Sequence, residues 1–389
     1  MSVAFRATIL SVVLAGCASQ ALPPTAATPN GKTQTSAPPV VVPQTVITPA
    51  DAATINELYD RAAAELNTGN AAKAASEFDR VFALAPDGPL APDALFQAGI
   101  AHEQAGDREA SLARFEQLAR RFPTHALGRD ALVRSVRLLA YLERWKRAGE
   151  AADLLLARQR ELRPFESVVA YSGKALGLVA SGEINAASYN IEKGRNVIDA
   201  NGLDQAGRVA RDLAQLYFAL GEVRRIRAEQ IRFMPVPENF PAVLEQRCQL
   251  LLDAQSAYSD TMRAYDAHWS AMAGYRVGEL YQKLHADLMA VPAPKGADTE
   301  ARKQLFEGAM RLRYSILLRK AVAMMEHTLA MAERTSERST WVLKAQDAKL
   351  KIDRAIKDED QAIDRLPYTR EQLQAALDDL AAKGSAKAP

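Results

Sequence analysis

The side chains suited to acid–base or metal chemistry are spread thinly along this chain. The five histidines stand singly, at His102, His125, His268, His285 and His327. A zinc site on one helix needs two ligands about three to five residues apart, and no pair of these histidines has that spacing. The chain also lacks a Gly-x-Ser-x-Gly turn and a glycine-rich phosphate loop. The sequence therefore predicts a protein that is not an enzyme and that uses no metal and no cofactor.

The first residues contain the one stretch whose spacing indicates a chemical modification. Arg6 precedes a short apolar run over residues 7–14, and the run ends in the segment Leu14-Ala15-Gly16-Cys17. A charge, an apolar run and small residues in this order are typical of a secretory signal, and the run is shorter than the ~20 residues that span a bilayer. The alternative is an ordinary signal peptide that carries a cysteine by chance.

The segment Leu14-Ala15-Gly16-Cys17 resembles the lipobox of bacterial lipoproteins. The resemblance implies that residues 1–16 are removed as a signal peptide and that Cys17 becomes lipidated. Several acyl chains would make a lasting anchor, because each buried CH₂ contributes ~0.8 kcal/mol. In Gram-negative lipoproteins an aspartate after the cysteine favours the inner membrane. Ala18 stands there in this chain, so the resemblance implies the outer membrane, facing the periplasm.

The stretch after Cys17 has the composition of a tether. Residues 18–50 contain seven prolines and many threonines and alanines, but only one charged residue, Lys32. Such a segment cannot bury enough apolar surface to fold, and its prolines favour an extended chain. We therefore expect residues 17–48 to form a disordered linker behind the lipidated cysteine, and the folded part to begin near Pro49.

Composition limits what the rest of the chain can be. It has 389 residues with 49 Lys and Arg against 47 Asp and Glu, and this balance gives no electrostatic case for binding nucleic acid. With Cys17 lipidated, Cys248 has no partner for a disulfide within the chain. An unpaired cysteine in the periplasm could form an intermolecular disulfide or be a reactive thiol. The leucines around Cys248 favour a buried, small apolar side chain instead.

The remainder has the composition and spacing of helices, and a sequence motif within it, called the repeat phrase below, recurs after 37 residues. The clearest copies, 69–86 and 106–123, share a glycine, a small residue, a phenylalanine and a closing proline at the same spacings. A third copy contains residues 130–132 and Ala148. Gly182 and Gly221 mark later and looser copies. Repeats of this length are typical of helical solenoids.

Each residue of the phrase has a physical role. The glycine fits the tight turn between two antiparallel helices, the small residue lets them approach, and the phenylalanine fills the gap between layers. The proline ends the second helix. These features resemble the tetratricopeptide repeat over roughly residues 51–160. The resemblance implies an all-α, tetratricopeptide-like solenoid of antiparallel helix pairs after a disordered Pro/Thr-rich tether. The longer linker at 86–92 resembles those of bacterial envelope members, such as the barrel-assembly lipoprotein and the cell-division coordinator.

We expect the repeats to cover residues 49–234 and a further helical, repeat-like region to cover 242–382. The second region could continue the same superhelix or form a separate bundle. It should open with one long helix carrying the apolar stripe Leu251, Ala254, Tyr258, Met262, Tyr265 and Trp269. Helices near 299–333 and 340–365 should follow, joined by a polar turn at 335–337. A last short helix should begin at Thr369, which forms a capping box with Gln372.

Stacked helix pairs line a concave groove with their first helices, which suits a peptide or a partner helix. By the family's pattern, the groove residues would be Tyr59, Asn67, Phe96, Ile100, Arg137 and Tyr141. The sequence thus predicts a non-enzymatic scaffold that docks envelope proteins into a periplasmic machine for assembly, secretion or surface motility. The alternative is an accessory protein of cell-wall maintenance that binds peptidoglycan or a small ligand. The predicted partners are envelope proteins or peptides, and the membrane through the lipid on Cys17.

Overall fold

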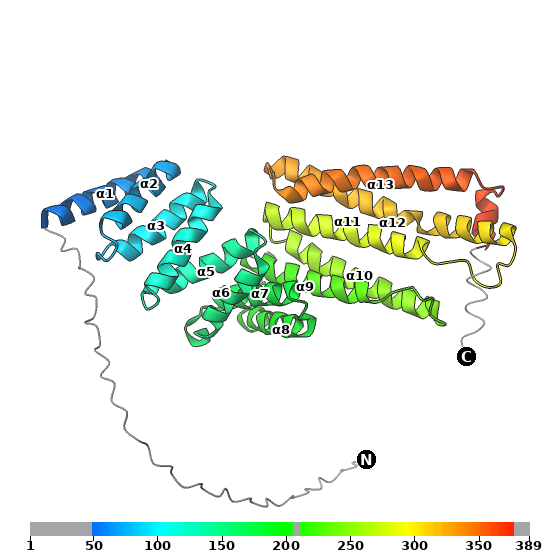
Figure 1. Ribbon diagram of the computed structural model, residues 1–389, viewed down its shortest axis with the longest axis horizontal. Helices are drawn as coiled ribbons and strands as arrows, with labels where there is room; N and C mark the ends of the chain where they lie inside the picture. Colours follow the sequence, from blue (N-terminus) through cyan, green and yellow to red (C-terminus); the bar gives the residue numbers. More distant parts are fainter. Residues whose placement is uncertain (1–48, 205–210, 377–389) are drawn as a thin grey trace, which may run out of the picture. The chain divides into compact units, whose positions relative to one another are not determined.

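The computed structural model describes residues 49–204 and 211–376, and within these residues the chain is helical and contains no strand (Figure 1). Its helices are α1 (Pro49–Asn67), α2 (Ala71–Leu84), α3 (Ala91–Gln104), α4 (Arg108–Arg121), α5 (Ala126–Tyr141), α6 (Trp145–Leu156), η1 (Gln159–Glu161), α7 (Pro164–Ala180), α8 (Ile184–Asn201), α9 (Arg211–Gln230), α10 (Phe240–Met262), α11 (Ala267–Met289), α12 (Glu300–Thr335) and α13 (Thr340–Asp364). None of the described helices is both long and apolar enough to cross a bilayer.

The first eight α-helices form antiparallel pairs, and the repeat phrase explains why. Gly69 and Gly106 lie in the turns inside the first two pairs with φ of 85°, a conformation that an L side chain rarely adopts. Phe78 and Phe115 are completely buried, as is Ala74. The second helices end just before the closing prolines, α2 at Leu84 and α4 at Arg121. The predicted solenoid of helix pairs is therefore confirmed.

Small residues let the next helices pack even more closely. A Cβ on Gly177 of α7 would lie 2.8 Å from the Cα of Gly149 on α6, so these two backbones touch. On α11, a Cβ on Gly278 would meet the end of the Met325 side chain of α12 at 2.4 Å. A single core cluster extends from Leu95 on α3 to Ile352 on α13. The C-terminal helices are thus packed onto the repeats through shared apolar contacts.

The expected single helix over residues 251–269 is wrong, because the chain reverses within it. α10 ends at Met262, and Tyr265 adopts a left-handed φ of 58° with 72% of its surface exposed. Asp266 then caps α11, its carboxylate accepting a hydrogen bond of 3.1 Å from the Trp269 amide. The apolar spacing continued across this break, so the capping aspartate was the only local signal of it.

The expectation that Gly221 marks a repeat turn is also wrong. Gly221 lies inside α9, where a Cβ would come within 2.5 Å of the Tyr258 ring of α10. The glycine gives room to an aromatic ring and does not form a bend. By contrast, Gly182 lies in the α7–α8 turn with φ of 82°, as the repeat predicts.

The predicted helices near 299–333 and 340–365 are confirmed as α12 and α13. They are joined by a turn in which Ser336 has a left-handed φ of 57°. The capping box after them is confirmed too. The Thr369 amide donates to the Gln372 side chain at 2.8 Å, and the Gln372 amide donates to the Thr369 hydroxyl at 3.3 Å. Leu373 of this last short helix is fully buried against the start of α12.

Candidate functional site

The residues predicted to line a partner groove lie on the first helices of three pairs. They are Tyr59 and Asn67 on α1, Phe96 and Ile100 on α3, and Arg137 and Tyr141 on α5. Asn67 is exposed, and the other five are half-buried. The predicted lipidation site, Cys17, lies outside the described residues.

The aromatic side chains of Tyr59 and Phe96 each contact the second helix of their own pair. The Tyr59 ring meets Phe78 edge to face with centroids 5.3 Å apart, and Phe96 meets Phe115 in the same way at 5.6 Å. Such aromatic pairs add about 0.5–1.5 kcal/mol beyond the area they bury. Each ring therefore stabilises its pair, and only its outer part remains available to a partner.

Arg137 is engaged within the protein. Its guanidinium forms an ion pair of 2.8 Å with Asp212, which joins α5 to α9. A partner that used this guanidinium would compete with Asp212 for it.

Tyr141 belongs to a stack of three side chains from different helices. The Arg108 guanidinium of α4 lies 4.3 Å above the Tyr141 ring centroid. On the other face, the His268 imidazole of α11 is stacked at 3.8 Å with an interplanar angle of 22°. Both faces of the tyrosine are thus covered by this protein's own side chains.

The stack forms one wall of a cleft of about 650 Å³ where several helix ends meet. From the repeats, its lining includes Gly106 of the α3–α4 turn, Tyr141 at the end of α5 and Glu143 just after it. From the C-terminal helices, it includes His268 at the start of α11 and Ser336 of the α12–α13 turn. The cleft therefore exists only because α11–α13 pack against the turns of the second and third repeats.

Glu143 occupies the place where the repeat puts glycine. It follows Gly106 by 37 residues and has a left-handed φ of 58°, which costs an L residue about 1–2 kcal/mol. Its carboxylate accepts a hydrogen bond of 2.7 Å from the Trp341 indole in the first turn of α13. Trp341 is 3% exposed, so this buried indole N–H needs its acceptor. The strain at Glu143 is offset by a contact that joins the third repeat to α13.

His268 is buried beside acids but makes no full hydrogen bond with any described residue. Its Nδ1 lies 3.6 Å from a Glu337 carboxylate oxygen, which is too long for a hydrogen bond. Burial lowers the pKa of the imidazole below its usual value, although Glu337, Asp266 and Glu143 act in the opposite direction. The ring is therefore neutral near pH 7.

The pKa of Tyr141 is shifted in the opposite direction. Burial raises the pKa of its hydroxyl to about 12, with Arg108 opposing the shift and Glu337 and Asp266 adding to it. The cleft thus presents a neutral tyrosine and a neutral histidine between arginine and carboxylate side chains. That arrangement suits the binding of a polar group.

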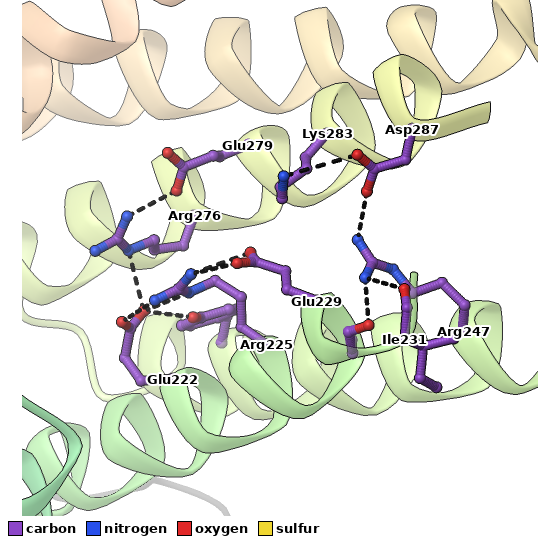
Figure 2. A network of polar contacts seen from close by, with 11 residues as sticks. Glu222, Arg225, Glu229, Ile231, Arg247, Arg276, Glu279, Lys283 and Asp287 are labelled. Carbon is purple, nitrogen blue, oxygen red and sulfur yellow. Dashed lines mark hydrogen bonds and ion pairs between the residues drawn. The ribbon is translucent and has the colours of Figure 1, made fainter. Parts of the chain in front are cut away.

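A second polar cluster joins α9, α10 and α11 in the interior (Figure 2). The Glu222 carboxylate accepts 2.6 Å and 2.8 Å hydrogen bonds from the Tyr258 hydroxyl and the Arg225 guanidinium. Arg276 forms an ion pair with it at 3.0 Å. Burial opposes the ionisation of Glu222, but Arg276 and Arg225 hold its pKa below the usual value. Removing one partner would leave buried charge uncompensated, so this cluster fixes how the three helices pack.

Arg247 of α10 caps the C-terminal end of α9. Its side chain is 2% exposed and donates to the Ala228 carbonyl, to the Ile231 carbonyl at 3.1 Å and to Asp287 at 3.0 Å (Figure 2). A cation at a helix C-terminus satisfies free carbonyls and is favoured by the helix dipole. Its next neighbour, Cys248, is half-buried against the core, and burial raises the pKa of that thiol.

The sequence predicted Tyr141 as a groove residue but did not show the side chains that surround it. Arg108 and His268 meet it only through the fold, and Trp341 reaches the nearby Glu143 in the same way, so no local spacing shows them. Glu143 did carry a signal, since it is the one departure from glycine in the clear 37-residue register. Among the described residues, no three His, Cys, Asp or Glu side chains lie close enough to hold a metal ion.

No family model matches the chain, and no curated protein matches its sequence. Among solved structures, a tetratricopeptide repeat protein from Parabacteroides merdae is 12% identical over 77% of this chain and 98% of that chain, with a TM-score of 0.41. A circular tandem repeat protein is 15% identical over 87% of this chain and 91% of that chain, with a TM-score of 0.17. The fold assignment rests on the chain's own helix pairs and turns, which define a tetratricopeptide-like helical solenoid.

The strained contact at Glu143 can be tested by comparing two substitutions. Glu143→Ala loses the hydrogen bond and keeps the strain, whereas Glu143→Gly loses the bond and relieves the strain. We expect Glu143→Ala to lower the free energy of unfolding by about 1 kcal/mol more than Glu143→Gly does. A double-mutant cycle with Trp341→Phe should give a coupling energy of about 1–2 kcal/mol.

Urea denaturation measures these differences. Gly106→Ala, at the same position one repeat earlier, gives a reference for the cost of a side chain at a positive φ. Equal stability of the two Glu143 variants, or a coupling energy near zero, would contradict the assignment.

His268 should make stability depend on pH. An unfolded histidine has a pKa of about 6.5, and the folded value is lower, so the unfolded chain binds more protons just below that pH. The free energy of unfolding should therefore fall as pH drops from about 6.5 towards the folded pKa. His268→Phe keeps a ring on Tyr141 and should reduce the loss between about pH 7 and pH 5.

The control is His327→Gln, which changes an exposed histidine on α12. Urea denaturation at the two pH values gives the difference for each variant. An equal loss of stability in the wild type and in His268→Phe would show that His268 does not cause it.

Proposed function

We propose that this chain is a non-enzymatic docking scaffold, anchored by lipid on Cys17 in the outer membrane, that brings together proteins of a periplasmic envelope machine. The observation that carries the proposal is the stack of helix pairs, whose first helices present side chains that the stack does not fully bury. Extended surfaces of this kind bind peptides and partner helices.

The first two pairs offer the freest part of this surface. Asn67 at the end of α1 is exposed, and Ile100 on α3 is half-buried. The Asn67 side chain forms no hydrogen bond with another described residue, and Ile100 packs only partly against the core. The surface near Arg137 and Tyr141 is more occupied, since Asp212 and the Arg108–His268 stack already engage those side chains. We therefore place the docking groove on α1 and α3.

The anchor and the tether support the same interpretation from the sequence. A lipid on Cys17 followed by a proline-rich segment would hold the helices at a distance from the bilayer while keeping them near it. Such an arrangement suits a protein that collects partners at a membrane surface.

The packing of the three tryptophans and of Tyr141 counts against the alternative of a glycan-binding protein, even though Tyr189 and Tyr265 are 58% and 72% exposed. Stacking on a sugar ring needs an open aromatic face. Trp269 and Trp341 are 6% and 3% exposed, and both faces of Tyr141 are covered. Trp145 is half-buried and stacked on Phe218.

Photo-crosslinking in cells tests the docking surface. A photoreactive amino acid at Ile100 should trap one or a few defined proteins, because this side chain lies on the proposed groove. The matched control is Leu154, which is 62% exposed on a second helix, α6. Trapping of the same proteins from both positions, or of none from Ile100, would contradict the proposal.

The anchor is tested separately by fractionation of the same cells. Cys17→Ser should move the protein from the membrane fraction to the soluble fraction, since it removes the acceptor of the lipid. A variant that stays in the membrane fraction would refute the anchor and leave the crosslinking result to decide on docking.

A further inference from the structure

The outer face of α13 carries apolar side chains that no described helix covers. Its inner face packs on α12 and α11 (Figure 1), and Trp341, Ala345 and Ile352 on that face are buried. Leu343 and Leu350 point the opposite way and are 62% and 59% exposed. They are two helical turns apart, about 10 Å, and so lie on one line along the helix.

This exposure is unusual for the last long helix of a stack. Terminal repeats need a polar outer face, because no further repeat covers them. The last short helix does not supply a cover at this place. Its Leu373 packs beside Gly308 near the start of α12, whereas Leu343 lies beside the end of α12.

A groove of about 630 Å³ adjoins Leu343. Its apolar lining comes from Leu329, Ala330 and Ala332 of α12 and from Val342 and Leu343 of α13, and the charged residues Glu333, Glu337 and Arg338 also line it. The groove is large enough for a side chain of a neighbouring helix. It gives Leu343 an adjoining pocket, as helix-in-groove contacts require.

Unpaired cations continue the line of leucines. Arg354 and Lys357 are exposed one and two turns beyond Leu350 and form no ion pair with a described residue. Among the acids on or beside this line, Asp347 is paired with Lys351 at 2.6 Å and Asp364 with Arg370 at 3.7 Å, whereas Asp358 is exposed next to Lys357. The two cations therefore exceed the remaining acid by one charge, and the face combines two leucines with a small positive excess at one end.

We propose that the outer face of α13 is a second docking surface, whose occupant is an amphipathic helix of another protein with apolar side chains followed by carboxylates. The apolar side chains would cover Leu343 and Leu350 and enter the groove, and the carboxylates would pair with Arg354 and Lys357. In a second copy of this chain, parallel pairing of α13 would place these cations against each other, whereas antiparallel pairing would set Leu343 against Leu350. Self-association is therefore the competing occupant, and sedimentation distinguishes the two. The proposal goes beyond the first-helix groove and does not depend on the anchor at Cys17.

Two synthetic helical peptides of about 20 residues test the surface. Both carry the same leucine stripe, one with glutamates and the other with lysines on its flanks. Binding to the full chain with Cys17→Ser is measured by fluorescence anisotropy at low salt. The glutamate peptide should bind at least about ten-fold more tightly than the lysine peptide.

Leu343→Asp should weaken the binding of the glutamate peptide by about ten-fold or more, since it places a charge in the apolar contact. Leu154→Asp, at an equally exposed leucine of α6, should leave the affinity unchanged. The pair Arg354→Glu and Lys357→Glu should abolish the preference between the peptides. Circular dichroism shows whether each variant is folded.

Equal binding of the two peptides, or unchanged binding by Leu343→Asp, would overturn the proposal. Two other occupants would also overturn it. One is a second copy, shown by self-association that depends on Leu343 in sedimentation without peptide. The other is a lipid surface, shown by Leu343-dependent binding to phosphatidylglycerol vesicles when the glutamate peptide does not bind.

Discussion

The hydrogen bond from the Trp341 indole to the Glu143 carboxylate joins residues 198 positions apart. One partner stands where two earlier repeats have glycine, and it keeps a left-handed backbone that disfavours a side chain. A strained residue persists only where its surroundings hold it in place. Here the surroundings are the first turn of α13 and its buried tryptophan. The contact keeps the turns of the second and third repeats beside α11–α13, and the cleft exists because they meet there.

The helices before and after this Trp341–Glu143 contact are themselves held together by packing and by buried charge. Before it, small residues and buried phenylalanines pack each helix pair on the next. After it, Glu222 and its two arginines hold α9 to α11, while Arg247 closes the end of α9. The Glu222 cluster and the Arg247 contacts both stabilise the packing through buried charge, because a buried charge that loses its partner is costly. A stack held together by such contacts can present separate surfaces to different partners, which suits a docking function.

Local spacing was enough to predict the helix pairs, because the first two repeats each carry a turn glycine, a filling phenylalanine such as Phe78 and a closing proline. It failed where a feature depends on distant residues. The reversal at Tyr265 was hidden by an apolar spacing that runs across it, and Gly221 makes room for Tyr258 of the next helix. The stack of Arg108, Tyr141 and His268 could not be predicted, since its members come from three helices. Glu143 is different, because the sequence itself shows it as a residue that replaces the expected turn glycine.

The central claim is that the third repeat and α13 form one cooperative unit through the Trp341–Glu143 contact. Hydrogen–deuterium exchange of the wild type and of Trp341→Phe measures it most directly. The account predicts faster exchange both at the start of α6 and at the start of α13, with exchange in α1 and α2 unchanged. Faster exchange in α13 alone, with α6 as slow as in the wild type, would contradict it.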